Sequence, residues 1–117
     1  MYPFQLYRPS TLREALELYN KHPGSCILAG GTDAMISFRA GKRAEARVID
    51  ILLPELTGIK ETDGAFEIGA CTTLFAIAEF FRTQPQPYCV LQETAESVGA
   101  CQTRHTATIG GNICTGN

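Results

Sequence analysis

Two glycine pairs are the features of the sequence with the clearest chemical potential. The first lies in residues 27–33, read I-L-A-G-G-T-D, and the second lies in residues 107–112, read A-T-I-G-G-N. Glycine permits positive φ and lets another group approach the backbone closely. The start of a helix presents unpaired N–H groups and a partial positive charge. Each pair is therefore a candidate site for an anion such as a phosphate.

Each pair also has a plainer interpretation as a tight turn, and Gly-Gly-Asn is an ordinary turn composition. Two such pairs, each beside a threonine, favour a shared ligand with at least two phosphates or an equivalent anion. Backbone N–H groups would hold its oxygens, and the side chains of Thr32, Thr108 and Asn112 could add hydrogen bonds. The pattern is neither a P-loop nor a Rossmann fingerprint, because G-x-x-x-x-G-K-[ST] and G-x-G-x-x-G are both absent.

The other polar residues near these pairs indicate no catalytic group. Asp33 would repel a pyrophosphate, so its expected role is to cap the following helix or to bond turn N–H groups. Arg104 either reaches a phosphate or carboxylate, or forms a structural salt bridge. His22 and His105 have a suitable intrinsic pKa for a general base, but nothing implies a Ser or Cys partner. We therefore predict a chain that holds a cofactor, with no catalytic residue and no metal site.

Composition and charge narrow the class of protein. The 117 residues fit one modest domain or two small lobes, and 44% apolar residues suffice for a packed core. With 10 basic and 12 acidic residues and no basic stripe, nucleic acid is not an expected partner. No apolar run approaches the roughly 20 residues of a membrane span, and the N-terminus does not resemble a signal peptide.

The five cysteines include no C-x-x-C pair, which argues against a disulfide framework and a zinc knuckle. Cys26 and Cys71 lie beside strand-like runs and are expected to be buried as small hydrophobic residues. A reducing cytoplasm fits this cysteine usage best.

The first half of the chain has the pattern of a small parallel α/β unit. Residues 4–6 predict a strand, and the capping box formed by Thr11 and Glu14 starts a helix that closes at 20–24. A buried strand at 25–29 leads into the first glycine pair. A helix at 33–38 and a strand at 47–51 follow. Apolar strands joined by helical crossovers indicate a small parallel sheet.

The second half has a different pattern. Two strands joined at Asp63-Gly64 predict a hairpin. A helix to Phe81 follows the candidate N-caps Thr72 and Thr73, and a second helix is expected at 88–98. Residues 100–117 are predicted to be mostly loop. We place the boundary between two lobes at residues 53–56, which gives lobes 1–54 and 55–117.

Four stretches carry a resemblance to a known family. They read F-x-x-Y-R-P-x-T-L-x-E-A-L at 4–16, L-A-G-G-T-D at 28–33, I-G-A-x-T-T at 68–73 and V-G-x-x-Q-x-R-x-x-A-T-I-G-G-N-I at 98–113. In order and spacing, over the whole chain, they resemble the FAD-binding (medium) subunit of the molybdenum hydroxylases, the group of xanthine dehydrogenase and carbon monoxide dehydrogenase. One departure is His105, where the family commonly has Asn after the arginine of Q-x-R.

The resemblance implies an α/β fold, α+β overall, of the two-lobed PCMH/vanillyl-alcohol-oxidase type that binds FAD. In such a fold a small parallel N-terminal lobe is followed by a mixed second lobe, and the FAD pyrophosphate lies between the two glycine segments. By motif position, the first segment would contribute Leu28, Ala29, Gly30, Gly31, Thr32 and Asp33. The second would contribute Ala107, Thr108, Gly110, Gly111, Asn112 and Thr115.

The resemblance also implies a function. Electrons from a substrate hydroxylated at molybdenum would pass through [2Fe-2S] clusters to FAD and then to an acceptor such as NAD. The expected partners are a molybdopterin-binding large subunit and a [2Fe-2S] small subunit, in a cytoplasmic hetero-oligomer, or a dimer. Five scattered cysteines cannot hold the clusters themselves.

Family subunits continue beyond the length of this chain, so we expect a fragment, a split subunit or an incomplete gene product, with a truncated second lobe. Apolar surface would then be exposed on the second lobe. The alternative hypothesis is a truncated scaffold or interaction module that binds no flavin and keeps only the fold. It predicts glycine segments that are disordered or far apart.

Overall fold

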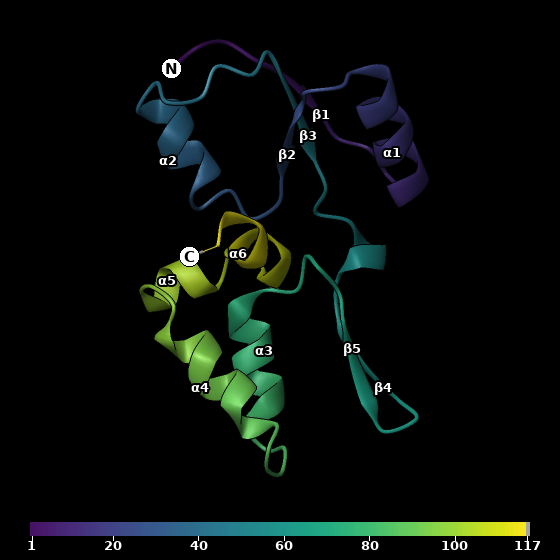
Figure 1. Cartoon of the computed structure of the whole chain (residues 1–117), viewed down its shortest axis with the longest axis vertical. Coiled ribbons are helices and arrows are strands. Elements are labelled where there is room, and N and C mark those ends of the chain that lie inside the picture. The colour runs from purple at the N-terminus through teal and green to yellow at the C-terminus, as the bar shows by residue number, and fades with distance from the viewer. Residues whose placement is uncertain (117) are drawn as a thin grey trace.

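The structure is a computed structural model that describes residues 1–116 (Figure 1). Its first half contains a three-stranded parallel sheet in the order β1-β3-β2. The elements are β1 (Gln5–Tyr7), α1 (Leu12–Lys21), β2 (Cys26–Leu28), α2 (Ala34–Arg39) and β3 (Arg47–Asp50). The predicted parallel α/β unit is thereby confirmed.

The central strand β3 explains why one helix covers each face of this sheet. Successive side chains of a strand point to opposite faces, and Val48 and Ile49 are both fully buried. Val48 packs with Phe38 of α2, whereas Ile49 packs with Ala15 of α1. Figure 1 shows α1 and α2 on opposite sides of the strands. Full burial of each such large apolar side chain contributes about 1.5–3 kcal/mol.

Helix α1 begins as the capping box predicts. The Thr11 hydroxyl accepts a hydrogen bond from the Glu14 backbone N–H at 3.1 Å. The returning bond is shifted by one residue, because the Glu14 carboxylate accepts from the Ser10 N–H at 2.7 Å rather than from that of Thr11. The threonine cap and the acidic first turn both stabilise the helix start.

The second half begins with η1 (Pro54–Leu56) and an antiparallel hairpin of β4 (Ile59–Thr62) and β5 (Ala65–Ile68). Asp63 and Gly64 at its turn have φ of 50° and 76°, the positive values that a type I′ hairpin turn requires. Helices α3 (Leu74–Phe81) and α4 (Cys89–Ser97) follow, and Thr73 caps α3 at the Ala76 N–H. The hairpin packs on α3 through Phe66, whose ring makes T-shaped contacts with the rings of Phe80 and Phe81.

The prediction that residues 100–117 are mostly loop is wrong. The described part holds α5 (Cys101–Arg104) and α6 (Ile109–Thr115), and Asn117 lies outside the described residues. The sequence is poor in helix formers there, but tertiary contacts override that propensity. The Ile109 N–H donates to the Thr72 carbonyl at 3.0 Å, and the Gly110 N–H donates to the Ala70 carbonyl at 2.8 Å.

Large apolar side chains are exposed in both halves, and not chiefly in the second as predicted. The second half exposes Phe75, Val90 and Ile113. The first half carries an apolar groove of about 240 Å³ beside α1, lined by Leu12, Ala15, Leu16, Tyr19, Ile27, Ile51 and Leu56. More of the exposed large apolar side chains therefore lie in the first half than in the second.

Candidate functional site

The first glycine segment leaves the carboxyl end of β2. The Leu28 carbonyl accepts from the Ile51 N–H at 2.8 Å, which fixes the segment to the strand beside it. Gly31 then adopts φ 73°, and its carbonyl accepts from the Met35 N–H at 3.0 Å as α2 begins. Positive φ favours glycine at this position. The predicted strand, turn and helix start are therefore all present, as β2, Gly31 and α2.

Gly30 is where the two glycine segments meet. A Cβ built on Gly30 would lie 2.0 Å from the Thr106 carbonyl oxygen and 2.8 Å from its carbonyl carbon. Only a residue without a side chain allows the two backbones this close. The hypothesis of a non-flavin scaffold predicts segments that lie apart, and that prediction is not met.

The second glycine segment is the first turn of α6, not the turn that we predicted. Thr108 is its N-cap and is 2% exposed, and its hydroxyl accepts from the Gly111 N–H at 3.2 Å. An isolated antiparallel bridge joins Thr108 to Thr73. The Ala107 carbonyl also accepts from the Leu74 N–H at 2.9 Å. The segment is thereby fixed to the start of α3.

Both segments line a single cavity of about 470 Å³. In Figure 1 this region lies where α6 approaches the end of β2 and the start of α2. Every residue that the family motif predicted lines the cavity except Gly110. Gly110 instead packs against the neighbouring chain, since a Cβ there would lie 2.8 Å from the Ala70 carbonyl oxygen. The predicted residues that line the cavity are Leu28, Ala29, Gly30, Gly31, Thr32, Asp33, Ala107, Thr108, Gly111, Asn112 and Thr115.

Several residues that line the cavity were not predicted from the sequence. Ser37 lies four residues after Asp33, and Cys114 lies three after Gly111, so helical spacing would have found both once the helices were placed. Nothing in the local pattern marks Arg43 or Thr103. The full set of additional lining residues is Ile27, Ala34, Ser37, Arg43, Val98, Gly99, Thr103 and Cys114.

Asp33 occupies the N-cap position of α2, but its side chain makes no capping hydrogen bond. Its backbone is helical, with φ −96° and ψ −42°, whereas a capping side chain normally needs an extended backbone. Capping, one of the two roles that we expected, is therefore wrong, whereas the other, a bond to turn N–H groups, stays a prediction. The Asp33 residue lines the cavity instead.

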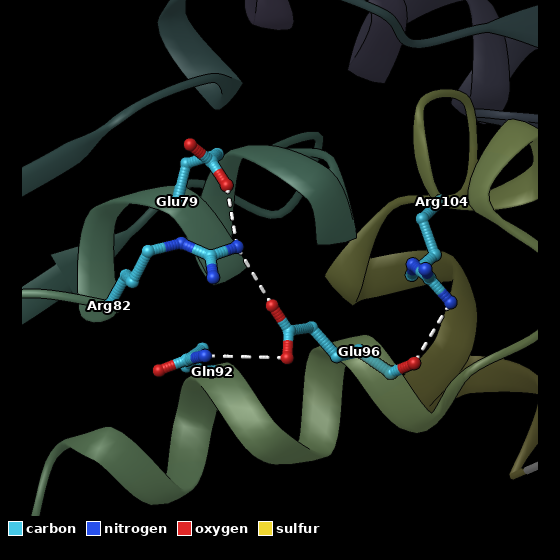
Figure 2. A network of polar contacts seen from close by, with 5 residues as sticks. All are labelled: Glu79, Arg82, Gln92, Glu96 and Arg104. Carbon is cyan, nitrogen blue, oxygen red and sulfur yellow. Dashed lines mark hydrogen bonds and ion pairs between the residues drawn. The ribbon is translucent and has the colours of Figure 1, made fainter.

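Arg104 neither reaches the cavity nor forms an ion pair with a described residue. Its Nη1 donates to the carbonyls of Glu96 at 2.8 Å and Gly99 at 2.9 Å, which ties α5 to the end of α4. Figure 2 shows this contact beside the ion pairs that link Arg82 to Glu79 and Glu96. Both alternatives predicted for Arg104, anion contact and salt bridge, are replaced by a structural role toward backbone carbonyls.

The histidines are engaged in ring stacking away from the cavity. His22 stacks on Tyr7 with ring centroids 5.4 Å apart, and its Nε2 lies 3.4 Å from the Tyr7 hydroxyl. His105 stacks on Phe75 at 3.9 Å, and its Nδ1 lies 2.9 Å from the Cys101 carbonyl oxygen. Neither residue lines the cavity.

The cavity offers hydrogen-bond donors rather than metal ligands. Its walls combine main-chain N–H groups of the first glycine segment with the hydroxyls of Thr32 and Ser37, the Asn112 amide and the Arg43 guanidinium. Within residues 1–116 no three His, Cys, Asp or Glu side chains gather as metal ligands would. This donor set suits an anionic ligand with several oxygens.

None of the helices in residues 1–116 is both long and apolar enough to cross a membrane.

The chain belongs to the family described as the FAD binding domain in molybdopterin dehydrogenase, whose model matches residues 2–117. It is 38% identical over 119 residues to the xanthine dehydrogenase FAD-binding subunit of Escherichia coli O157:H7, covering 99% of this chain and 40% of that protein. It is 35% identical over 120 residues to the nicotinate dehydrogenase FAD-subunit of Eubacterium barkeri, covering 98% of this chain and 40% of the relative.

Comparison with solved structures leads to the same group of proteins. A chain of reconstituted CO dehydrogenase from Oligotropha carboxidovorans superposes with a TM-score of 0.89 at 29% identity, over 100% of this chain and 42% of that one. This confirms the mixed α/β fold class, with a small parallel sheet and an antiparallel hairpin. The chain spans about 40% of the length of the curated relatives cited above.

The residues present fit the phosphate part of FAD. At Gly30 the cavity is lined by main chain, because a Cβ there would clash with the Thr106 carbonyl. The cavity also contains hydrogen-bond donors for several phosphate oxygens. The cavity contains one acidic residue, Asp33, and one basic residue, Arg43, among its described lining residues. It is therefore polar without being strongly negative.

Proposed function

We propose that this chain is the FAD-binding part of a molybdenum-containing hydroxylase of the xanthine dehydrogenase type. The bound FAD would take electrons from [2Fe-2S] clusters and pass them on, with NAD as the proposed acceptor. The chain would thus be a subunit, or part of one, of an FAD-dependent oxidoreductase. The family match and the shared cavity of the two glycine segments support this proposal.

The observation that carries the proposal is the convergence of both predicted segments on one cavity. In our proposal the FAD pyrophosphate lies between Gly31 and Gly111, where backbone N–H groups of the first glycine segment and the Thr32 and Thr108 hydroxyls can donate to its oxygens. All the predicted lining residues except Gly110 would contact the cofactor. Gly110 would act indirectly, by allowing α6 to pack on Ala70.

The proposed partners are a molybdopterin-binding large subunit and a [2Fe-2S] small subunit, in a cytoplasmic hetero-oligomer. This chain would supply flavin binding, whereas substrate binding and the metal centres would belong to the partners. We also propose that residues 1–54 and 55–117 are separate lobes that share the cofactor. In support, the buried cores of the two parts form distinct clusters, with Ile49 in one and Phe81 in another.

The test is flavin retention by the chain and by its complex with the proposed partners. Purified protein is mixed with FAD, desalted and examined by visible spectroscopy, and the dissociation constant is measured by titration. We expect flavin bands to be retained, and Gly111→Val to weaken FAD binding while far-UV circular dichroism stays unchanged. Ala76→Val is the matched control, because it places valine at an exposed helix position that does not line the cavity. Absence of flavin binding even in the complex would refute the proposal.

A further inference from the structure

The cavity contains a side chain that no sequence motif predicted, the guanidinium of Arg43. Among the described residues that line the cavity, only Asp33 and Arg43 carry a full charge at neutral pH. Main-chain N–H groups provide partial charges, and the Asp33 carboxylate opposes an anion. A ligand with two phosphate charges therefore gains a full positive countercharge in this cavity only from Arg43.

The Arg43 guanidinium is held in place from three directions. Its Nη1 donates to the Cys26 sulfur at 2.8 Å and lies 3.6 Å from Glu45 Oε1. Its Cζ lies 6.0 Å from the centre of the Phe38 ring, within range of a cation–π interaction. A long side chain fixed in this way loses less conformational entropy when it binds a ligand than a freely rotating lysine would.

These contacts leave the guanidinium able to bind an anion. The contacts to Cys26 and Glu45 both involve Nη1, whereas a guanidinium has five N–H donors. The Arg43 side chain is 41% exposed, so part of it faces the open cavity. Burial raises the pKa of the Cys26 thiol despite the nearby arginine, so at neutral pH the sulfur is an uncharged acceptor that does not neutralise Arg43.

We propose that Arg43 sets the preference of this cavity for a phosphate-bearing ligand, by supplying a pre-positioned countercharge and N–H donors to the phosphates. The inference rests on the proposed function, since it takes FAD as the ligand. It adds a specificity residue from outside both glycine segments. Glu45 has the opposite effect, because its carboxylate competes with the ligand for the same guanidinium.

The test compares ADP with adenosine as competitors of FAD, on the full chain and on its complex with partner subunits. We expect Arg43→Gln to weaken ADP binding about 10- to 100-fold, as loss of one charge-assisted contact implies. Adenosine binding should stay within about twofold of wild type, because adenosine has no phosphate. Arg43→Lys keeps the charge without the planar fork and should lose about three- to tenfold in ADP affinity.

Lys42→Gln is the matched control, because it removes the same charge one residue away from a side chain that does not line the cavity. Its ADP affinity should stay within about twofold of wild type in physiological salt. Circular dichroism and the unfolding midpoint report whether each variant folds. If Arg43→Gln does not fold, the ADP affinity of Arg43→Lys decides the test.

If FAD still binds, three results would overturn the proposed role of Arg43 and leave the proposed function standing. They are unchanged ADP affinity in both Arg43 variants, an equal loss in Lys42→Gln, or an equal loss of adenosine and ADP binding. A wild-type chain and complex that bind neither FAD nor ADP would overturn both the proposed function and this inference.

Discussion

The two glycine pairs share a sequence pattern but occupy different backbone conformations. Gly31 needs positive φ, at 73°, and ends a strand. Gly110 and Gly111 lie in the first turn of α6, where the backbone is helical. The common factor is the close approach of another main chain, which touches Gly30 through Thr106 and Gly110 through Ala70. In this chain both glycine pairs therefore mark a close contact between main chains, whereas only the first forms a turn.

The two pairs also differ in what holds them. The first is attached to the parallel sheet through the hydrogen bond between Leu28 and Ile51. The second is attached to the beginning of α3 by backbone bonds to Ala70, Thr72 and Leu74. The cavity thus lies between two independently supported segments, and substitutions can separate their contributions.

The largest effect is expected from Gly30→Ala. Its Cβ would lie 2.0 Å from the Thr106 carbonyl oxygen, and both neighbours are main chain, so the two segments must move apart. We expect a loss of about 3 kcal/mol in the free energy of unfolding, at the upper end of overpacking costs, together with loss of FAD binding. Urea unfolding and FAD titration measure the two quantities.

Gly24→Ala is the control for Gly30→Ala, because Gly24 has positive φ but open space around it. It should cost only about 1 kcal/mol, the penalty of a left-handed backbone, and should leave FAD binding unchanged. Equal unfolding free energies for the two variants would mean that the contact between the segments is not tight.

A smaller effect should distinguish the two residues of the second pair. A Cβ at Gly110 would lie 2.8 Å from the Ala70 carbonyl oxygen, whereas one at Gly111 would meet only the Thr108 hydroxyl, at 3.1 Å. We expect Gly110→Ala to destabilise the protein by about 1–2 kcal/mol. Gly111→Ala should lie within about 1 kcal/mol of wild type, because alanine favours the helix.

Urea unfolding of the two variants side by side checks this difference. The reverse order, with Gly111→Ala the more destabilised, would contradict the assignment of these glycines to a helix turn packed on Ala70.

The smallest effect concerns the cysteines near the two segments. Cys114 lines the cavity and is exposed, whereas Cys101 is exposed outside it. Bound FAD should slow alkylation of Cys114 severalfold and leave Cys101 unaffected. Cys26 and Cys71 should react slowest, because both are buried and burial raises the pKa of each thiol.

Mass spectrometry after timed iodoacetamide labelling, with and without FAD, gives the rate at each cysteine. Equal protection of Cys101 and Cys114 would indicate a general change in the protein rather than a ligand in this cavity.

Much of the fold follows from local sequence signals. The capping box at Thr11 and Glu14 and the turn at Asp63-Gly64 each specify an element through contacts within a few residues. The buried stripe of α3 comes from hydrophobic period alone. These predictions are confirmed because short-range chemistry decides them.

The rest depends on contacts between distant parts of the chain. Helix α6 forms on a glycine-rich sequence because Thr72 and Ala70 accept its first N–H groups. Arg43 enters the cavity because Cys26 and Glu45 orient it, and Arg104 is drawn to carbonyls at the end of α4. No local pattern encodes such partners, so the sequence predicted the glycine segments of the cavity, with Asp33, but not Arg43.

The contact between Gly30 and Thr106 has one more consequence. The spacing of the segments there is set by main-chain atoms, which no substitution at position 106 can remove. Side chains around the rim can change the polarity and charge of the cavity without changing its width at this point. Substitutions of the surrounding side chains, such as Arg43, can therefore change the ligand preference of the cavity while the spacing of the two segments at Gly30 stays constant.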